Sequence, residues 1–415
     1  MVAWPGMGPL EELLFLGTLM ALGAFSIDVM LPALEATAHR YGTSPTAAQL
    51  VVGLYFLGFA LGQLLWGPLM DALGRRKVLR GALFGFSLAA LATVAAPGFS
   101  LLLAARFVQG FFAASFRIGV TASIRDRYRG EAMARRLSYA LLVLMVAPVL
   151  APALGVALLA LGPWAPYALP AFLGLLALLW SGRFRETLRP LRLASLGEGA
   201  LLVLRDRRAG LYALALGGVF GILYAYLAAS AELYKAHLGL SNPAFALAFG
   251  ATGLVLAGAN LLGPQVVARL GLGKALRRAV AGLLALLLFL PLHALAPRPF
   301  PFWLHLTSVL LLVVFTFPNA QARALEGLGK VAGLAASFTG FLSTLLAALL
   351  GTLVGQASGG APLPFSLGLL GLGVLAFAAV FLAEASPLCG SPPPGGPGGS
   401  PPGSAPPGGG GGPGG

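Results

Sequence analysis

The segment Gly67-Pro68-Leu69-Met70-Asp71-Ala72-Leu73-Gly74-Arg75-Arg76-Lys77 follows a long apolar run. A related segment, Gly263-Pro264-Gln265-Val266-Val267-Ala268-Arg269-Leu270-Gly271-Leu272-Gly273-Lys274, follows another apolar run 196 residues later. Two copies of one loop, each placed after an apolar run, indicate a chain built from two related halves. Parallel repeats of this kind are typical of membrane transporters, whose substrate sites lie between the halves near the midplane of the bilayer.

The composition around these loops excludes an ordinary soluble protein. Charged residues are 10% of the chain and hydrophobic residues are 58%, whereas a soluble domain carries roughly 25% charged residues. Too few polar side chains are present to cover a soluble surface, so the bilayer is the expected solvent. The net charge of +14 does not indicate nucleic-acid binding, because the basic residues lie in short loops and no compact basic domain is present.

The apolar runs predict an all-α membrane protein with twelve transmembrane helices in two six-helix halves. A span needs about 20 mostly apolar residues. Such runs fall near 11–33, 47–70, 78–97, 100–122, 137–161, 163–182, 209–231, 243–268, 275–296, 300–322, 331–355 and 362–384. We therefore divide the chain into an N-terminal half (1–182), a cytoplasmic linker (183–208), a C-terminal half (209–385) and a Pro/Gly-rich tail (386–415) that we expect to be disordered.

The basic residues predict the orientation of the spans. Of the 27 Lys and Arg residues, 22 lie in the loops after even-numbered spans, and only Arg40, Lys235 and Arg298 lie in the opposite loops. The positive-inside rule then places both termini in the cytoplasm. The two acids and the lack of basic residues at the N-terminus argue against a cleaved signal peptide. We expect a multi-pass protein of the cell (inner) membrane.

Two ionisable residues lie inside predicted spans at a similar depth. Asp28 lies in the outer half of the first span, four residues before Pro32, and Arg106 lies near the outer end of the fourth span. Burying a charge in a span costs at least about 2.5–3.5 kcal/mol, so such residues by default face the bundle interior and serve function. Loss of hydration favours a neutral carboxyl, whereas a nearby guanidinium favours the anion. A carboxyl balanced in this way can load and release a proton; the alternative is a static ion pair that fixes helix packing.

The fourth span carries two further polar residues. Gln109 is three residues beyond Arg106, and Arg117 is eleven beyond. Eleven residues at about 100° each return to within about 20° of the starting direction, so the three side chains share one face. We predict that Arg117 faces the interior or a cavity. The alternative is a side chain that extends toward the cytoplasmic end of the span.

Other polar residues within the spans are candidates for the wall of a substrate cavity, although aromatic side chains at span ends often only anchor a helix at the membrane interface. These candidates are Tyr55, Gln63, Tyr224, Tyr226, Asn260 and Asn319. The chain has one cysteine, Cys389, and four histidines without ligand spacing, so we expect no metal site.

Two motifs predict conformational roles. In the first loop, Gly67 and Gly74 permit tight turns, and Asp71 can pair with Arg75 or Arg76 to latch the helices on the inner face. Such a latch can bias inward-open against outward-open states. The fifth span contains Pro148, Pro152 and Gly155, and its prolines predict a kinked helix.

The order of these motifs resembles the major facilitator superfamily, and within it the drug:proton antiporters of the bicyclomycin-resistance (Bcr/CflA) branch. The resemblance covers about residues 10–385. Ser26–Leu34 is similar to the first-span signature of that branch, and Gly67–Lys77 is similar to the superfamily loop, although Ala72 stands where the family usually has Arg. Arg106–Gly110 resembles the fourth-span motif, whose Arg is implicated in proton coupling.

Three further segments carry the same resemblance. Ile124-Arg125-Asp126 is similar to the inner end of the branch's fourth span, Ala147-Pro148 with Pro152 and Gly155 to the fifth-span antiporter motif, and Phe317-Pro318-Asn319-Ala320 to the tenth-span signature. The resemblance implies a monomeric efflux transporter that expels small molecules in exchange for protons. The proton gradient would be its energy source, and no cofactor would be needed.

Other functions stay open at this point. Within transport, the protein could export an endogenous metabolite such as an amino acid, or import by proton symport. A membrane-embedded enzyme acting on a lipid-linked substrate is disfavoured because no paired catalytic groups, metal motif or nucleotide-binding loop is present. A non-transporting sensor would need a folded soluble module, and the sequence contains none.

Overall fold

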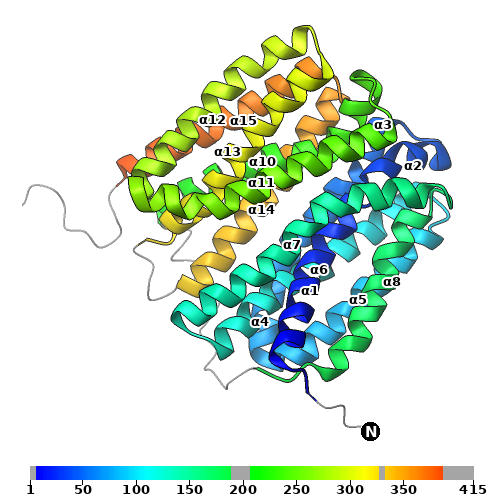
Figure 1. The fold of residues 1–415 in the computed structure, drawn as a ribbon, viewed down its shortest axis with the longest axis vertical. Coiled ribbons are helices and arrows are strands. Elements are labelled where there is room, and N and C mark those ends of the chain that lie inside the picture. The colour runs from blue at the N-terminus through cyan, green and yellow to red at the C-terminus, as the bar shows by residue number, and fades with distance from the viewer. Residues whose placement is uncertain (1–5, 188–205, 327–331, 387–415) are drawn as a thin grey trace, which may run out of the picture.

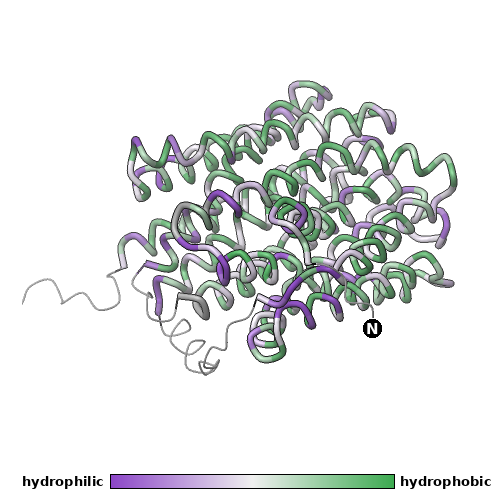
Figure 2. The backbone as a smooth tube through the Cα atoms, turned by 60° about the horizontal axis from the view of Figure 1, so that its bottom comes forward, coloured by the Kyte–Doolittle hydropathy of each residue, from purple (hydrophilic) through white to green (hydrophobic). Residues whose placement is uncertain are grey.

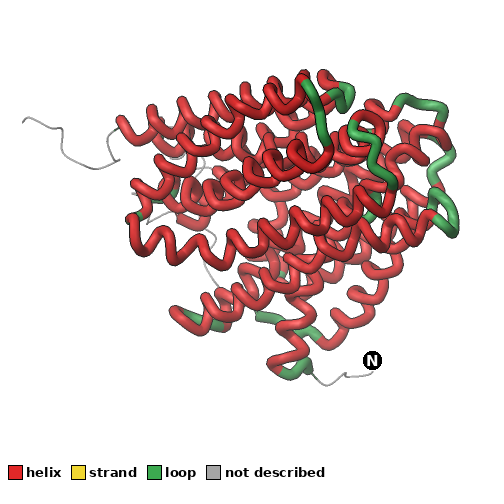
Figure 3. The backbone as a smooth tube through the Cα atoms, turned by 45° about the horizontal axis from the view of Figure 1, so that its top comes forward, coloured by secondary structure: helices red, strands yellow, loops and turns green. Residues whose placement is uncertain are grey.

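The structure, a computed structural model, describes residues 6–187, 206–326 and 332–386. These residues form helices joined by short turns, with no strand among them (Figure 3). Twelve helical segments are long and apolar enough to cross a membrane. The prediction of twelve spans is thus confirmed, including the division of 137–182 into two spans, which a turn at residues 160–164 separates.

The N-terminal half contains the first six spans. Its main helices are α1 (Pro9–Asp28), α4 (Leu50–Leu73), α5 (Arg75–Ala95), α6 (Phe99–Arg127), α7 (Gly130–Leu159) and α8 (Ala165–Trp180). Between α1 and α4 lie a 3₁₀ turn, η1 (Leu31–Ala33), and the short helices α2 (Leu34–Tyr41) and α3 (Pro45–Ala48). A further 3₁₀ turn, η2 (Ser181–Arg183), follows α8.

The C-terminal half contains the other six spans. Its helices are α10 (Arg207–Glu232), α11 (Asn242–Leu270), α12 (Leu272–Leu295), α13 (Pro299–Ala324), α14 (Ala332–Ser358) and α15 (Pro362–Ala385), with a π-helical turn, η3 (Leu233–His237), after α10. Helix α10 begins two residues before the predicted boundary at 209. Most of the predicted linker and nearly all of the predicted tail lie outside the described residues.

Helix ends follow local sequence signals. The side chains of Asp206 and Ser241 accept hydrogen bonds from backbone N–H groups at the starts of α10 and α11, as N-cap residues do. Helix α5 begins after Gly74, whose φ of 95° is a backbone conformation that favours glycine. Hydrophilic segments gather near the ends of helices, and the lengths between them are mostly hydrophobic (Figure 2).

The helices of each half pack mainly against one another, so the molecule consists of two bundles side by side (Figure 1). In the N-terminal bundle α4 packs closely along α6, because glycines face the partner backbone. A Cβ atom on Gly58 would lie 1.9 Å from the Phe107 carbonyl oxygen, and one on Gly110 would lie 1.9 Å from that of Tyr55. In the C-terminal bundle α10 packs against both α14 and α15.

The bundles meet along two pairs of helices, α4 with α14 and α7 with α11. We call the end of the molecule where Gly74 joins α4 to α5 the basic end, because it carries most of the basic loops, and the opposite end, where Tyr41 ends α2, the far end. The polar contacts found between the two halves lie at the far end, as described below. The residues midway along the spans therefore lie between two halves that polar contacts join at the far end.

Candidate functional site

Asp28 lies where the first span changes direction. Helix α1 ends at this residue, and the chain continues through η1, in which Pro32 has no backbone N–H to extend the helix. Its side chain is only 4% exposed. Among the acidic side chains that the structure describes, only Asp28 has neither a hydrogen bond nor an ion pair. It lies within electrostatic range of Tyr55 in its own half and of Tyr226 in the other half.

Arg106 is fully buried on α6 and held mainly by oxygen atoms that carry no full charge. Its Nε donates to the Val51 carbonyl at 3.2 Å, and its Nη1 donates to the Ser26 carbonyl at 3.3 Å. The same nitrogen donates to Gln109 Oε1 at 2.6 Å. The guanidinium also lies over the Tyr55 ring, 4.5 Å from its centroid, which adds a cation–π contact.

Arg106 contacts the turn that contains Asp28, but the two side chains do not form an ion pair. The carbonyl that Arg106 binds belongs to Ser26, two residues before Asp28. This carbonyl is available because it lies in the last turn of α1, where carbonyl groups lose their intrahelical partners. The backbone N–H of Met30 bonds instead to Ile27. The alternative of a static Asp28–Arg106 ion pair therefore finds no support in this conformation.

Tyr55 and Gln109 support Arg106 in this conformation and offer almost no exposed surface. The Tyr55 hydroxyl donates to the Gly23 carbonyl at 2.8 Å and accepts from the Ser26 hydroxyl at 2.9 Å. Gln109 uses its amide oxygen on Arg106. Their predicted place in the wall of a substrate cavity stays a prediction.

Arg117 differs from Arg106 because its side chain is exposed. It nevertheless lies within electrostatic range of Tyr224, which belongs to α10 in the other half. The exposed side chain therefore lies on a span that also approaches the opposite half. The expected position of Arg117 facing the interior or a cavity stays a prediction. Tyr224 in turn stacks on Phe56 of α4, with ring centroids 3.6 Å apart and planes 15° from parallel.

The remaining candidates of the C-terminal half have different surroundings. Tyr226 is buried and stacks against Phe249 at 5.5 Å. Asn319 is nearly buried, and its amide donates to the Phe315 carbonyl at 2.6 Å. Asn260 is exposed, and its amide donates to the Leu256 carbonyl. The structure therefore does not gather these three side chains into one polar cluster.

The predicted latch forms within the N-terminal half. Arg75 lies 2.6 Å from Asp71 and 3.1 Å from Asp126, which belongs to α6. Glu186, in the segment after α8, accepts from the backbone N–H groups of Arg75 and Arg76. Arg76 also donates to the Gly182 carbonyl at 2.8 Å. The latch thus ties α4, α5 and α6 to the segment after α8, whereas a Cβ on Gly67 would meet nothing within 4 Å.

The fifth span, α7, packs against the first span of its own half and against α11 of the other half. A Cβ on Gly155 would lie 2.0 Å from the Val29 carbonyl oxygen, so α7 closely approaches the chain just after Asp28. One on Gly253 of α11 would lie 3.1 Å from the Cβ of Pro148. Pro148 and Pro152 both lie inside α7. This helix therefore contacts both the break beside Asp28 and the other half.

Polar contacts at the far end join the two halves. Glu232, at the end of α10, accepts from Gln49 Nε2 at 2.7 Å and from the Thr46 hydroxyl at 3.1 Å. Lys235 lies 2.6 Å from Glu35 of α2. Gln356 of α14 donates to the Thr46 carbonyl at 2.6 Å. We call this set of contacts the far-end seam.

The sequence of the chain decides its family. The family described as Major Facilitator Superfamily matches residues 13–352. The chain belongs to the Major Facilitator Superfamily. Members of this superfamily are transporters, so the protein is a membrane transporter of small molecules and not an enzyme.

Relatives within the superfamily match most of the chain. An uncharacterized MFS-type transporter of Bacillus subtilis is 31% identical over 360 residues, which are 82% of this chain and 87% of the relative. A bicyclomycin resistance protein homolog of Haemophilus influenzae is 30% identical over 369 residues, which are 86% of this chain and 92% of the relative. The resemblance to the bicyclomycin-resistance branch is therefore confirmed.

Solved structures of superfamily members share the fold. The crystal structure of a D-xylose-proton symporter has a TM-score of 0.74 at 15% identity and covers 90% of this chain and 97% of that chain. A bacterial homolog of the human lysosomal transporter Spinster, in an inward-facing and occupied conformation, has a TM-score of 0.69 at 15% identity and covers 92% of this chain and 98% of that chain. At these identities the likeness concerns the fold alone.

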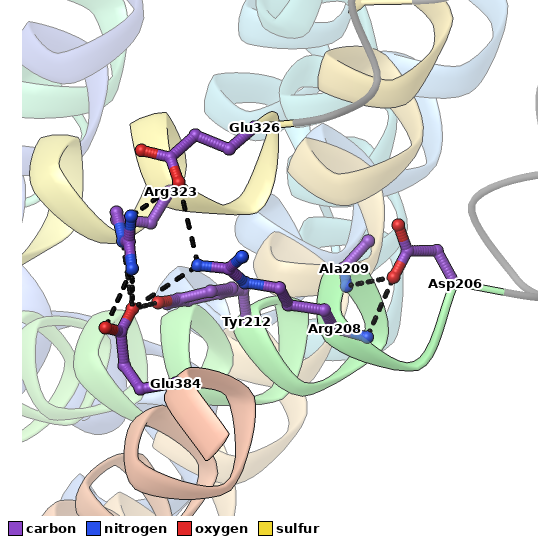
Figure 4. A network of polar contacts seen from close by, with 7 residues as sticks. All are labelled: Asp206, Arg208, Ala209, Tyr212, Arg323, Glu326 and Glu384. Atoms are coloured by element: carbon purple, nitrogen blue, oxygen red, sulfur yellow. Dashed lines mark hydrogen bonds and ion pairs between the residues drawn. The ribbon is translucent and has the colours of Figure 1, made fainter. Parts of the chain in front are cut away.

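The sequence analysis did not predict two sets of polar contacts in this transporter. The first is the far-end seam, which the opposite charges of Glu35 and Lys235 near the ends of the first and seventh spans could have indicated. The second is a network at the basic end of the C-terminal half. There Arg323 donates to both oxygens of Glu384, and Arg208 lies 3.6 Å from Glu384 and from Glu326 (Figure 4). Charged residues at the ends of three spans on the same side are its sequence signal.

Proposed function

We propose that this transporter is a proton-coupled exporter of small molecules, a drug:proton antiporter that works by alternating access. The observation that carries the proposal is the carboxyl of Asp28, which is buried at a helix break, within electrostatic range of both halves, and has no hydrogen bond or ion pair among the residues that the structure describes. A carboxyl in such a place can exchange a proton when the cavity opens to one side or the other. The names of the relatives, which include a bicyclomycin resistance protein homolog and a chloramphenicol resistance protein of Pseudomonas aeruginosa, support drug-like substrates.

The arrangement of the halves supports alternating access. The far-end seam is a set of hydrogen bonds and one ion pair, and such contacts can break and form again as two bundles rock about a central site. The protein is proposed to act as a monomer in the cell (inner) membrane with both termini in the cytoplasm, so that the far end faces outward. The proton gradient is then its energy source.

The test uses everted membrane vesicles from an efflux-deficient bacterium, after susceptibility profiling of the same strain has supplied a substrate. Uptake should need the proton gradient and stop with an uncoupler. Asp28→Asn keeps the shape of the side chain and removes its proton, so it should abolish gradient-driven uptake while a neutral substrate still binds to the purified protein. Glu11→Gln, at the other end of the same helix α1 and paired with Arg183 away from the seam, is the control variant and should keep coupled uptake.

Three outcomes would contradict the proposal. Uptake that persists with an uncoupler but needs ATP would remove proton coupling. Full coupled uptake by Asp28→Asn would remove Asp28 from the coupling role, and Glu232 in the far-end seam would be the next carboxyl to test. Uptake in the same direction as protons would instead identify a symporter.

A further inference from the structure

We propose that Arg117 binds an anionic group of the substrate, so that the compounds this transporter prefers are organic anions, in particular apolar molecules with one carboxylate. The inference rests on the proposed export function, because it names the substrate class of the same central path. Four observations carry it: the direction of Arg117, its missing counter-ion, its aromatic surroundings and the polar face that leads to it.

The first observation is the direction in which Arg117 points. Helix α6 exposes Leu101 and Val108 on one face, which in a membrane span is the lipid-facing side. Arg117 is nine residues beyond Val108, and nine residues at about 100° each rotate by about 180°. Its exposed side chain therefore leaves the helix on the face opposite the lipid.

The depth of Arg117 argues against a side chain that only reaches for the membrane surface. Ten residues separate it from the end of α6 at Arg127, which is about 15 Å of helix. That length exceeds the reach of an arginine side chain, so the guanidinium does not extend past the end of α6. An arginine at this depth is costly unless a polar cavity or a partner stabilises it.

The second observation is that, among the residues that the structure describes, no carboxylate forms an ion pair with Arg117. The described acidic side chains other than Asp28 are engaged elsewhere: with Arg75, Arg127, Arg183, Lys235 or Arg323, with backbone N–H groups, or with the amide of Gln49. Asp28 and Arg117 form no ion pair with each other. Arg106 differs in this respect, because three oxygen atoms already hold it.

The third observation is the apolar surface next to the guanidinium. Tyr224, within electrostatic range of Arg117, stacks on Phe56 and lies 5.8 Å from the ring of Phe220. Phe220 in turn contacts Phe317 at 3.7 Å. These rings come from α4, α10 and α13, so they cross between the halves. A guanidinium beside such a surface fits a molecule with an aromatic or aliphatic body and a single acidic group, since arginine binds carboxylates through charge-assisted hydrogen bonds.

The fourth observation is a polar face that leads from the basic end to Arg117. Thr121 and Arg125 follow at intervals of four residues, and both are exposed. The Thr121 hydroxyl donates to the Arg117 carbonyl at 2.9 Å. The face of α6 thus carries two guanidinium groups and one hydroxyl along the path. A path lined by positive charge raises the local concentration of anions.

The anion site and the proton site are separate. Arg117 lies eleven residues from Arg106, which is about 16 Å along the helix, and Arg106 contacts the turn that contains Asp28. This length is greater than the Debye length of about 8 Å at physiological ionic strength, so the exposed guanidinium of Arg117 couples only weakly to Asp28 through solvent. Loss of Arg117 should therefore change which substrates bind and leave the proton step at Asp28 in place.

The experiment measures binding of matched ligand pairs to the purified full-length protein in detergent. Each pair is an aromatic carboxylate and its primary amide, for example 1-naphthylacetate and 1-naphthylacetamide. The wild type should bind the acids at least about tenfold more tightly than the amides, a difference of about 1.4 kcal/mol. Arg117→Met should remove this preference and leave amide binding unchanged, and Arg117→Lys should retain part of it. Arg298→Met, which removes an exposed charge at the far end, is the matched control.

The outcomes separate this inference from the proposed export function. Equal binding of acids and amides by the wild type, or an unchanged acid preference in Arg117→Met, overturns the anion site. If Arg117→Met is not monodisperse, Arg117→Lys and Arg117→Gln carry the same comparison. The binding measurement needs no proton gradient. If Asp28→Asn still exports with full coupling while Arg117→Met loses the acid preference, the proton mechanism is wrong and the anion site stands.

Discussion

Lys235 of the C-terminal half lies 2.6 Å from the carboxylate of Glu35 in the N-terminal half. This is the one ion pair between the halves among the described residues, and it lies at the far end beside the hydrogen bonds of Glu232. The ion pairs at the basic end stay within one half. Among the described residues, the polar contacts thus favour a conformation that is closed at the far end and has no such contact between the halves at the basic end.

Removing this ion pair should shift the protein toward opening at the far end. Glu35 is 56% exposed, and exposed pairs contribute up to about 1 kcal/mol, so Lys235→Met should raise the open population by up to about fivefold. Val52, fully buried in α4 near the seam, reports on this opening when it is replaced by Cys in a Cys389→Ser background. Its labelling in whole cells by a membrane-impermeant maleimide should become faster.

The control for this measurement is Arg298→Met, which removes a basic residue of the same end without breaking a contact between the halves. The exchanged pair Glu35→Lys with Lys235→Glu should restore slow labelling, because the ion pair re-forms with reversed polarity. Fast labelling in the exchanged pair would mean that the side chains act through packing and not through their charges.

The spans could be predicted from the sequence, whereas the hydrogen bonds of the seam could not. An apolar run of about 20 residues identifies a membrane helix on its own, so 11–33 and its eleven counterparts needed no tertiary information. The seam joins Thr46 to Glu232 and to Gln356, over 186 and 310 residues of chain. Nothing local marks these residues, because their partners are set by how the two bundles dock.

The candidate site shows the same division. The helical period correctly placed Arg106 and Gln109 on one face, where they form a hydrogen bond. It could not show that Arg106 bonds to the Ser26 carbonyl instead of the Asp28 carboxylate, since that depends on where α1 ends. Likewise, the loop motif indicated that Asp71 pairs with Arg75, but the second carboxylate, Asp126, comes from the C-terminal end of another helix, α6.

Breaking the latch should destabilise the N-terminal half. Arg75 is 1% exposed and pairs with both Asp71 and Asp126. Removal of one partner from a buried ion pair costs about 3–5 kcal/mol because it leaves an uncompensated charge. Arg75→Met should therefore lower the midpoint of thermal unfolding in detergent. Lys77→Met, at an exposed position two residues away, should leave it unchanged, and equal midpoints for the two variants would contradict a structural role for the latch.

The topology can be tested with one reporter at the basic end of the molecule and one at the far end. A periplasm-active reporter fused after Glu384 should stay silent, because the excess of basic residues retains that end of α15 in the cytoplasm. The same reporter inserted after Gly42, in the turn between α2 and α3, should be active. Activity in the first fusion and silence in the second would invert the orientation and place the basic end outside.

A covalent link across the far-end seam should stop transport, since alternating access requires the halves to separate there. A Cβ on Gly53 of α4 would lie 3.3 Å from the Cβ of Thr352 on α14, close to the 3.5–4.5 Å range of disulfides. Gly53→Cys with Thr352→Cys, in a Cys389→Ser background, should form a disulfide on oxidation, lose transport and regain it with reductant. The matched control lies within one half: a Cβ on Gly368 of α15 would also lie 3.3 Å from the Cβ of Val354 on α14. Gly368→Cys with Val354→Cys should cross-link equally well and transport normally, because these two helices move together as one bundle. Unimpaired transport by the oxidised cross-half pair would show that the far end does not open during the cycle.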